Sequence, residues 1–187
     1  MSSYNKNKSK FIDLAINTGR KGMANLLEHL EQIEFFTAPA STKYHLSIPE
    51  GLLIHSLNVC DFMLNEFNEI INNNDISIDS VIISSLFHDV GKAGYFGKQM
   101  YIPNCLDEPE SQPSFSYNKN RLDVMHEIVS IQIVSNYIQL SEEETFAILY
   151  HNGLYSPLGD STKGKEQKLQ QLLHFADMWC SRFIESR

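Results

Sequence analysis

An aspartate in an apolar helical segment is the feature that most constrains how this chain can fold. Residues 78–90 have the apolar periodicity of an α-helix. On that helix Asp89 falls on the same face as Ile78, Ile82 and Leu86, in the middle of the apolar stripe. A buried, ionised carboxylate is very costly unless a cation compensates it. Because His88 directly precedes Asp89, the sequence indicates that this cation is a metal ion.

The alternative interpretation is that His88 and Asp89 simply end the helix. An aspartate at the C-terminus of a helix interacts unfavourably with the helix dipole. A role in ending the helix therefore explains Asp89 less well than a role in binding a metal.

Other polar residues lie in similarly apolar helical surroundings. Taken singly, each is an ordinary residue of a core or a helix end. Taken together with His88 and Asp89, they supply the mixed nitrogen and oxygen donors that hold one or two divalent transition metals between helices. These residues are His55, His126, His151 and Asp177.

The periodicity predicts an all-α fold, a single helical bundle. We expect a flexible arm over residues 1–10 and one domain over residues 11–187, since no linker or repeat divides the chain. A stretch rich in glycine, proline and aromatic residues predicts a short β-hairpin that pairs Tyr95–Ile102 with Phe115–Asn118. The expected helices are 11–36 (in two pieces that break near Thr18 and Gly19), 50–72, 78–90, 122–140, 141–151 and 165–186.

Composition excludes several classes of protein. The net charge of −8 argues against a protein that mainly coats the backbone of nucleic acids. No apolar run is long enough to span a membrane, and the polar start of the chain does not resemble a secretory signal. The three cysteines are far apart and odd in number, which argues against a disulfide scaffold and favours the cytoplasm.

The order of these residues resembles that of the HD-domain superfamily of metal-dependent phosphohydrolases. In that all-helical superfamily the ligands run His, then His-Asp, then Asp, which match His55, His88-Asp89 and Asp177. Members with two metal ions carry two further histidines before the last aspartate, and His126 and His151 have that order.

The resemblance is closer to small stand-alone bacterial and phage HD hydrolases related to the HD domain of bacterial 3′–5′ exoribonucleases. It covers about residues 35–185. Two departures are Glu50-Gly51, where Gly-Gly is common, and Asn152, where such relatives can carry a second histidine. The matching stretches are 38–45, 51–59, 86–92, 150–153 and 174–177.

The resemblance implies an enzyme of EC class 3.1 that hydrolyses a phosphate ester or anhydride of a nucleotide. One ion would be held by His55, His88, Asp89 and Asp177, and a second by His126 and His151, with Asp89 bridging. The metal would be Mn, Co, Fe, Ni, Zn or Mg, and Lys92 would neutralise a phosphate oxygen. The stretch 95–120, which we call the excursion, is the expected substrate-recognition segment. The expected substrate contacts are Tyr117, Lys119 and the adjoining Arg121, together with Lys43 and His45 before the His55 helix.

Three other functions remain open from the sequence. A 3′–5′ exonuclease on single-stranded RNA or DNA would use the same metal ligands, although the negative charge and the missing nucleic-acid-binding module count against it. An HD protein with two irons would oxidise its substrate with O₂. A non-catalytic binding module is the third, and the complete ligand set argues against it. The resemblance is also compatible with a homo-oligomer.

Overall fold

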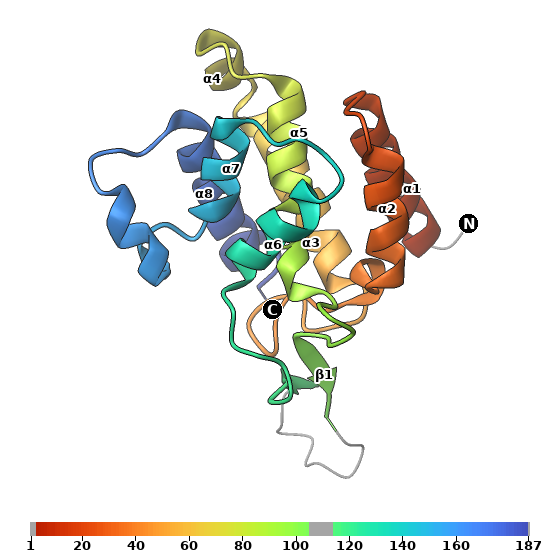
Figure 1. Cartoon of the computed structure of the whole chain (residues 1–187). Coiled ribbons are helices and arrows are strands. Elements are labelled where there is room, and N and C mark those ends of the chain that lie inside the picture. The colour runs from red at the N-terminus through yellow and green to blue at the C-terminus, as the bar shows by residue number, and fades with distance from the viewer. Residues whose placement is uncertain (1–2, 105–113, 187) are drawn as a thin grey trace.

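The fold, seen in a computed structural model that describes residues 3–104 and 114–186, is a helical bundle with a small hairpin at one end (Figure 1). Helices α3 and α5 pack against each other in the middle of the bundle. The predicted all-α class is confirmed. The helices are α1 (Ser3–Asn17), α2 (Met23–Gln32), α3 (Gly51–Glu66), α4 (Asn68–Asn73), α5 (Ile78–Phe87), α6 (His126–Ser135), α7 (Glu142–Leu149) and α8 (Lys168–Trp179).

Two apolar clusters hold α3 in place from opposite sides. The first joins α1, α2, α5 and α6 around Phe11, whose ring lies 5.3 Å from the ring of Phe35 and 5.6 Å from that of Phe87. The second joins α3 to α8 through residues such as Met63 and Leu173. As a result, α3 is fixed between α5 and α8, and polar residues on these three helices lie close together.

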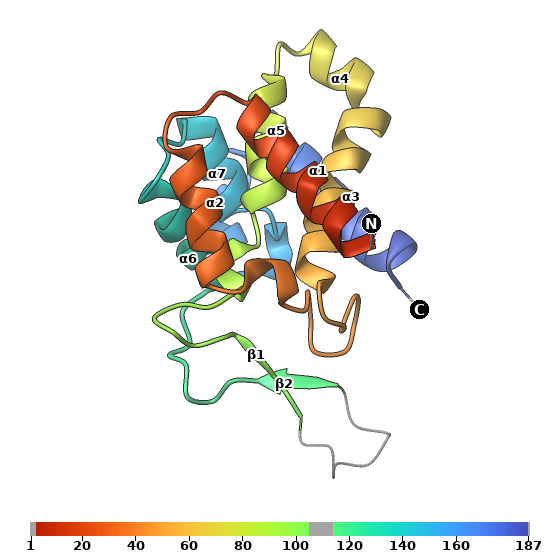
Figure 2. The same ribbon diagram turned by 90° about the vertical axis from the view of Figure 1, so that its right-hand side faces the viewer.

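Helix α1 begins earlier than the sequence predicts. The expected arm covers residues 1–10, whereas the structure is helical from Ser3 onward and α1 crosses α3 and α5 (Figure 2). The polar part of this helix is held by ion pairs, because Lys8 contacts Glu31 and Lys10 contacts Asp61. Pairing of charges across helices is not visible in the periodicity of one segment.

Helix α5 ends before Asp89, which corrects the prediction of a helix over residues 78–90. It stops at Phe87, and a 3₁₀ turn, Val90–Lys92, follows. On a continuous helix Ile78 and Asp89 would lie on the same face. In the structure Ile78 is 42% exposed, whereas Asp89 is 1% exposed. The turn after α5, not a continuous helical stripe, therefore buries Asp89.

Two other predicted helices are interrupted. The helix expected over residues 50–72 breaks at Phe67, between α3 and α4. The helix expected over residues 165–186 continues past α8 as a π-helical turn, Cys180–Ile184. The predicted break between α1 and α2 is confirmed, and Ser141 caps α7.

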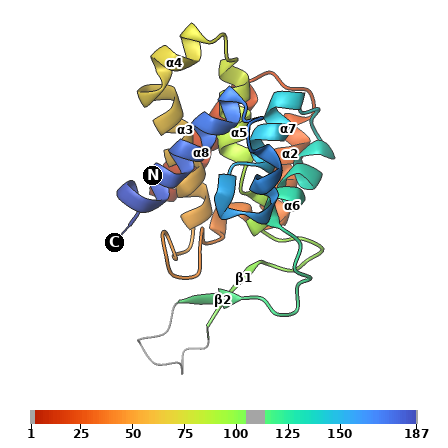
Figure 3. The same ribbon diagram turned by 90° about the vertical axis from the view of Figure 1, so that its left-hand side faces the viewer.

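The predicted hairpin is present but shorter. Strand β1 (Tyr101–Pro103) pairs antiparallel with β2 (Phe115–Tyr117), with Tyr101 opposite Tyr117. Figure 3 shows the hairpin projecting from one end of the bundle. Residues 106–113, which the sequence assigns to the same substrate-recognition excursion, lie outside the described residues. Within the described chain, no helix has both the length and the apolar character needed to cross a bilayer.

Candidate metal centre

Asp89 lies at the point where four histidines converge. Its Oδ1 is 3.1 Å from Nε2 of His126 and 3.5 Å from Nε2 of His151. Its Oδ2 is 3.4 Å from Nε2 of His88 and 3.6 Å from Nε2 of His55. The structure thus brings together side chains that come from separate segments of the chain.

Asp177 completes the predicted ligand set. Its Oδ1 lies 3.1 Å from Nε2 of His55, which is itself 3.3 Å from Nε2 of His88. The donor atoms of His55, His88 and Asp177 form one compact group, and those of His88, Asp89 and His151 form another. All six predicted ligands therefore meet in one place.

Helix ends position most of these side chains. His88 caps the C-terminus of α5, His126 is the first residue of α6, and His151 follows the end of α7. His55 and Asp177 instead lie within α3 and α8. A polar side chain at a helix end does not replace an apolar side chain in the interior of the bundle. The fold can therefore bring these polar residues together and keep its apolar core.

Gly91 permits the close approach of α6 to the turn that carries Asp89. A Cβ atom at this position would lie 2.1 Å from the carbonyl oxygen of His126. The Gly91 N–H also donates a hydrogen bond of 2.8 Å to Oγ of Ser130 on α6. The absence of a side chain at Gly91 is thus needed to place His126 beside Asp89.

Backbone carbonyls orient two of the histidines. The Nδ1–H of His88 donates to the carbonyl of Ser85, and the Nδ1–H of His151 donates to that of Ile148, both at 2.8 Å. A proton fixed on Nδ1 leaves the lone pair of the neutral ring on Nε2, the atom that faces Asp89. This is the arrangement by which proteins prepare histidine as a metal ligand.

Carboxylates lie beside Nδ1 of the other two histidines, His55 and His126. Nδ1 of His55 lies 2.9 Å from Oε2 of Glu185, and Nδ1 of His126 lies 3.3 Å from Oε2 of Glu127. Nδ1 of His55, His88 and His151 therefore faces a hydrogen-bond acceptor, Nδ1 of His126 has a carboxylate nearby, and Nε2 of all four rings faces the centre. The sequence does not predict Glu127 or Glu185 as parts of the site.

The donor set fits a divalent transition metal. His55, His88, Asp89 and His151 are almost completely buried, and Oδ1 of Asp89 has no hydrogen-bond donor among the described residues. Lone pairs on several nitrogens that face carboxylate oxygens repel one another unless protons or a cation lie between them. Imidazole nitrogens combined with carboxylates suit Zn, Fe, Ni, Co and Mn.

The electrostatic surroundings of the cluster favour positive charge between its carboxylates. Burial opposes protonation of His55, but Asp177 and Glu185 outweigh it and raise the pKa of His55 to about 10. Burial lowers the pKa of His88. Burial also opposes ionisation of Asp89, yet Lys92 and the histidines hold the pKa of Asp89 well below its ordinary value. Without a metal, protons supply the positive charge between the two aspartates.

Lys92 contacts the carboxylate at the centre of the cluster. Its Nζ lies 2.5 Å from Oδ2 of Asp89. Burial opposes the charge of Lys92, but Asp89 outweighs it and raises the pKa of Lys92. The structure therefore places Lys92 in the site, with its ammonium group paired to Asp89.

Among the described residues, Tyr117, Lys119 and Arg121 do not line the cavity that opens beside Asp177. Arg121 is buried, and its guanidinium donates to the carbonyls of Gly91 (2.6 Å) and Ala93 (2.8 Å). The hydroxyl of Tyr117 donates to Asp123, and Lys119 is exposed. A cation in a loop can bind a phosphate or clamp the backbone, and sequence alone does not distinguish the two.

His45 lies beside His55, and it shares a cavity with Lys43. The His45 ring centroid is 5.0 Å from that of His55, and both His45 and Lys43 line a cavity of about 290 Å³ together with Glu185. Burial, with the charges of His55 and Lys92, lowers the pKa of His45 to about 4.

A cavity of about 400 Å³ opens directly beside the cluster. Asp177 and Asn152 form its inner wall. Asn152 was noted in the sequence only as a departure from the HD pattern. Its Nδ2 lies 3.0 Å from Nε2 of His151 and 3.0 Å from Oε1 of Glu127. The other lining residues are Tyr44, Tyr155, His174, Met178, Ser181 and Arg182.

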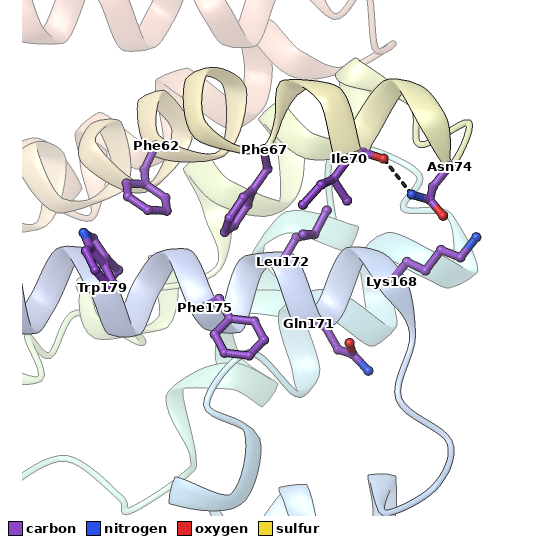
Figure 4. Close-up of a pocket in the computed structure, with 9 residues that line it drawn as sticks. All are labelled: Phe62, Phe67, Ile70, Asn74, Lys168, Gln171, Leu172, Phe175 and Trp179. Carbon is purple, nitrogen blue, oxygen red and sulfur yellow. Dashed lines mark hydrogen bonds between the residues drawn. The ribbon is translucent and has the colours of Figure 1, made fainter.

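A larger cavity, of about 520 Å³, lies away from the cluster between α3, α4 and α8 (Figure 4). Aromatic and aliphatic side chains form most of its wall, including Phe62, Phe67, Leu172 and Trp179. No histidine or carboxylate is among its lining residues. By size alone this larger cavity would be the candidate site. The ionisable groups, however, converge beside the smaller cavity at Asp177, which is therefore the better candidate.

Comparison with known proteins adds no relative. No family model, no curated protein and no solved structure matches this chain. What is established here is a mostly helical fold with a buried cluster of histidines and carboxylates that could hold a metal ion.

Proposed function

We propose that this protein is a metal-dependent phosphohydrolase of the HD-domain type, which cleaves a phosphate ester or anhydride of a nucleotide. One observation carries the proposal. Four Nε2 atoms lie 3.1–3.6 Å from the carboxylate of Asp89, and Nδ1 of three of those rings (His55, His88 and His151) faces its own hydrogen-bond acceptor. Burying so many polar groups costs free energy of folding, and an ordinary apolar core does not need them.

The distances around Asp89 support a division of the six side chains between two ions. Oδ2 of Asp89 lies nearest Nε2 of His88 and His55, whereas Oδ1 lies nearest Nε2 of His126 and His151. His55, His88 and Asp177 would therefore hold one ion, and His126 and His151 would hold a second, with Asp89 shared. Bound divalent ions supply Lewis acidity, which lowers the pKa of a water molecule and offsets negative charge on a phosphoryl group. Burial of the cluster limits access by bulk water and strengthens these electrostatic interactions.

The cavity beside Asp177 supports a small substrate. Its volume of about 400 Å³ lies in the range typical of small-molecule sites. Tyr44 and Tyr155 are 76% and 67% exposed, so both rings present solvent-accessible surface on which a base can stack. The guanidinium of Arg182 lies 5.0 Å from the ring centroid of Tyr155, and within the described chain no carboxylate forms an ion pair with it. Arg182 can therefore contact a phosphate.

The test is phosphate release by protein purified without chelators. We would assay mono-, di-, tri- and cyclic nucleotides and a short oligonucleotide, each with Mn²⁺, with Co²⁺ and with no added metal. Asp89→Asn is assayed in parallel. Asp160→Asn is the matched control, because Asp160 is exposed and forms an ion pair with Lys163 rather than with a histidine of the cluster.

The proposal predicts metal-dependent release from one nucleotide class, lost in Asp89→Asn and kept in Asp160→Asn. Release only from the oligonucleotide, with a steep salt dependence, would favour the exonuclease instead. Bound iron with oxygen uptake and no phosphate release would identify the oxygenase. Bound metal with neither reaction would favour a binding module.

A further inference from the structure

We propose that Glu185 is a positioning residue, which holds the His55 ring in the orientation that directs Nε2 at the metal. The inference rests on the metal centre of the proposed function and names a residue outside the predicted ligand set. Glu185 lies just after the π-helical turn Cys180–Ile184.

The Glu185 carboxylate is buried and has specific partners. Its side chain is 1% exposed. Its two oxygens lie 2.9 Å and 3.2 Å from Nδ1 of His55, and Nδ2 of Asn58 donates to Oε1 at 2.9 Å. Burying a carboxylate is costly, so these contacts must compensate for the lost hydration.

His55 is consequently held between two carboxylates. Nε2 lies 3.1 Å from Asp177, while Nδ1 lies 2.9 Å from Glu185. Because Nδ1–H donates to Glu185, the ring cannot turn away, and Nε2 remains directed at the metal position. An acceptor of this kind also makes the ligating nitrogen more basic.

The π-helical turn explains how one helix supplies both carboxylates. With 3.6 residues per turn, a regular helix would place Glu185 roughly 80° around the axis from Asp177. In the π turn the Glu185 N–H instead donates to the carbonyl of Cys180, at 2.9 Å. The wider turn takes up about one additional residue, which brings Glu185 back toward the face of Asp177.

The competing explanation is that Glu185 only fastens the end of the chain to α3. That role would affect the stability of the protein but would leave a folded molecule with its normal affinity for metal. Metal affinity, measured without any substrate, therefore separates the two explanations.

The experiment measures Co²⁺ affinity by competition with a chelator, together with the visible absorption spectrum of the bound ion. Glu185→Gln keeps the shape of the side chain and removes its charge, and Glu185→Asp keeps the charge. Glu143→Gln is the matched control, since Glu143 is an exposed glutamate on α7. His55→Ala reports whether the metal centre itself exists.

We expect Glu185→Gln to weaken Co²⁺ binding by about 10–100-fold and to change the Co²⁺ spectrum. Glu185→Asp should recover part of the affinity, and Glu143→Gln should match the wild type. If Glu185→Gln does not fold, Asn58→Ala decides, because it removes only the donor to Oε1 and should weaken binding to a smaller extent.

Wild-type affinity in Glu185→Gln, with binding lost in His55→Ala, would overturn the role of Glu185 and leave the proposed function intact. Unchanged affinity in His55→Ala as well would overturn both. Wild-type affinity in a folded Asn58→Ala, where Glu185→Gln is unfolded, would also reject the positioning role.

Discussion

The ammonium group of Lys92 lies 2.5 Å from Oδ2 of Asp89, the carboxylate on which four histidines converge. Lys92 is thus part of the charge balance of the cluster. With metal bound, the ions supply positive charge to the same carboxylate. Removing Lys92 should therefore affect the metal-free protein more than the metal-bound one.

Lys92→Met tests this expectation. In the presence of a chelator, the variant should be less stable than the wild type by about 3 kcal/mol, since a buried carboxylate loses its partner. Added Mn²⁺ should restore much of the difference, and metal content should be retained. Thermal unfolding with and without chelator measures both effects, and an equal stabilisation by Mn²⁺ in the two proteins would contradict the account.

Arg121 should behave as a structural residue. Its guanidinium clamps the carbonyls of Gly91 and Ala93, next to the turn that carries Asp89. Arg121→Met should lower the free energy of unfolding by about 3 kcal/mol, because two charged hydrogen bonds are lost. Denaturant titration provides the measurement, with the exposed Lys119→Met as control. A variant of normal stability but impaired substrate binding would return Arg121 to the recognition role that the sequence predicts.

Arg182 should act on substrate binding. Its guanidinium lines the cavity beside Asp177 and has no carboxylate partner in the described parts of the chain. Loss of a charged hydrogen bond to phosphate should raise KM about 10-fold or more in Arg182→Ala, with a small change in kcat. Steady-state kinetics separate the two constants. If Lys119→Ala raises KM and Arg182→Ala does not, the substrate lies on the hairpin side instead.

Glu144, which contacts none of the clustered histidines, should make the free energy of unfolding depend on pH. Its buried carboxylate accepts hydrogen bonds from Arg20 (2.7 and 2.9 Å), Ser80 and the Ser141 N–H. Burial opposes its ionisation, but Arg20 and the other donors outweigh it and lower the pKa of Glu144 below 4.5. The ionised form therefore stabilises the folded state fully above pH 4.5, and this contribution disappears as pH falls through the lower pKa of the folded protein.

The variant for this prediction is Glu144→Gln. We expect a loss of about 3 kcal/mol in the free energy of unfolding at pH 7, and a smaller difference from the wild type below pH 4.5. Urea titrations of both proteins at several pH values measure it. A difference that stays constant down to pH 3 would show that the charge of Glu144 contributes nothing.

Periodicity and polar residues in apolar surroundings are sufficient to predict most of the helices and the six residues that the fold brings together. Each of these residues is visible in the sequence because its own segment is apolar, as with His55 in α3 and Asp177 in α8. Burial of Asp89 was predicted for the wrong geometric reason, since it lies in a turn after α5 rather than on the helical stripe.

The supporting residues could not be predicted in the same way. Glu185 reaches His55 through a π-helical turn, and a periodicity of 3.6 residues does not reveal such a turn. Arg121 contacts backbone carbonyls, which carry no signature in the side-chain sequence. Asn152 follows His151 in the sequence, but its contact with Glu127 on α6 and its place beside Nε2 of His151 are visible only in the folded chain.

The central claim is that the side chains around Asp89 hold metal, and metal content tests it most directly. Protein purified without chelators and reloaded with Mn²⁺ or Co²⁺ would be analysed by mass spectrometry of the elements, for the wild type, Asp89→Asn and Asp160→Asn. We predict one or two ions per chain in the wild type and in Asp160→Asn, and a clear loss in Asp89→Asn. A wild type that retains no divalent metal, or an Asp89→Asn variant that retains all of it, would contradict the account.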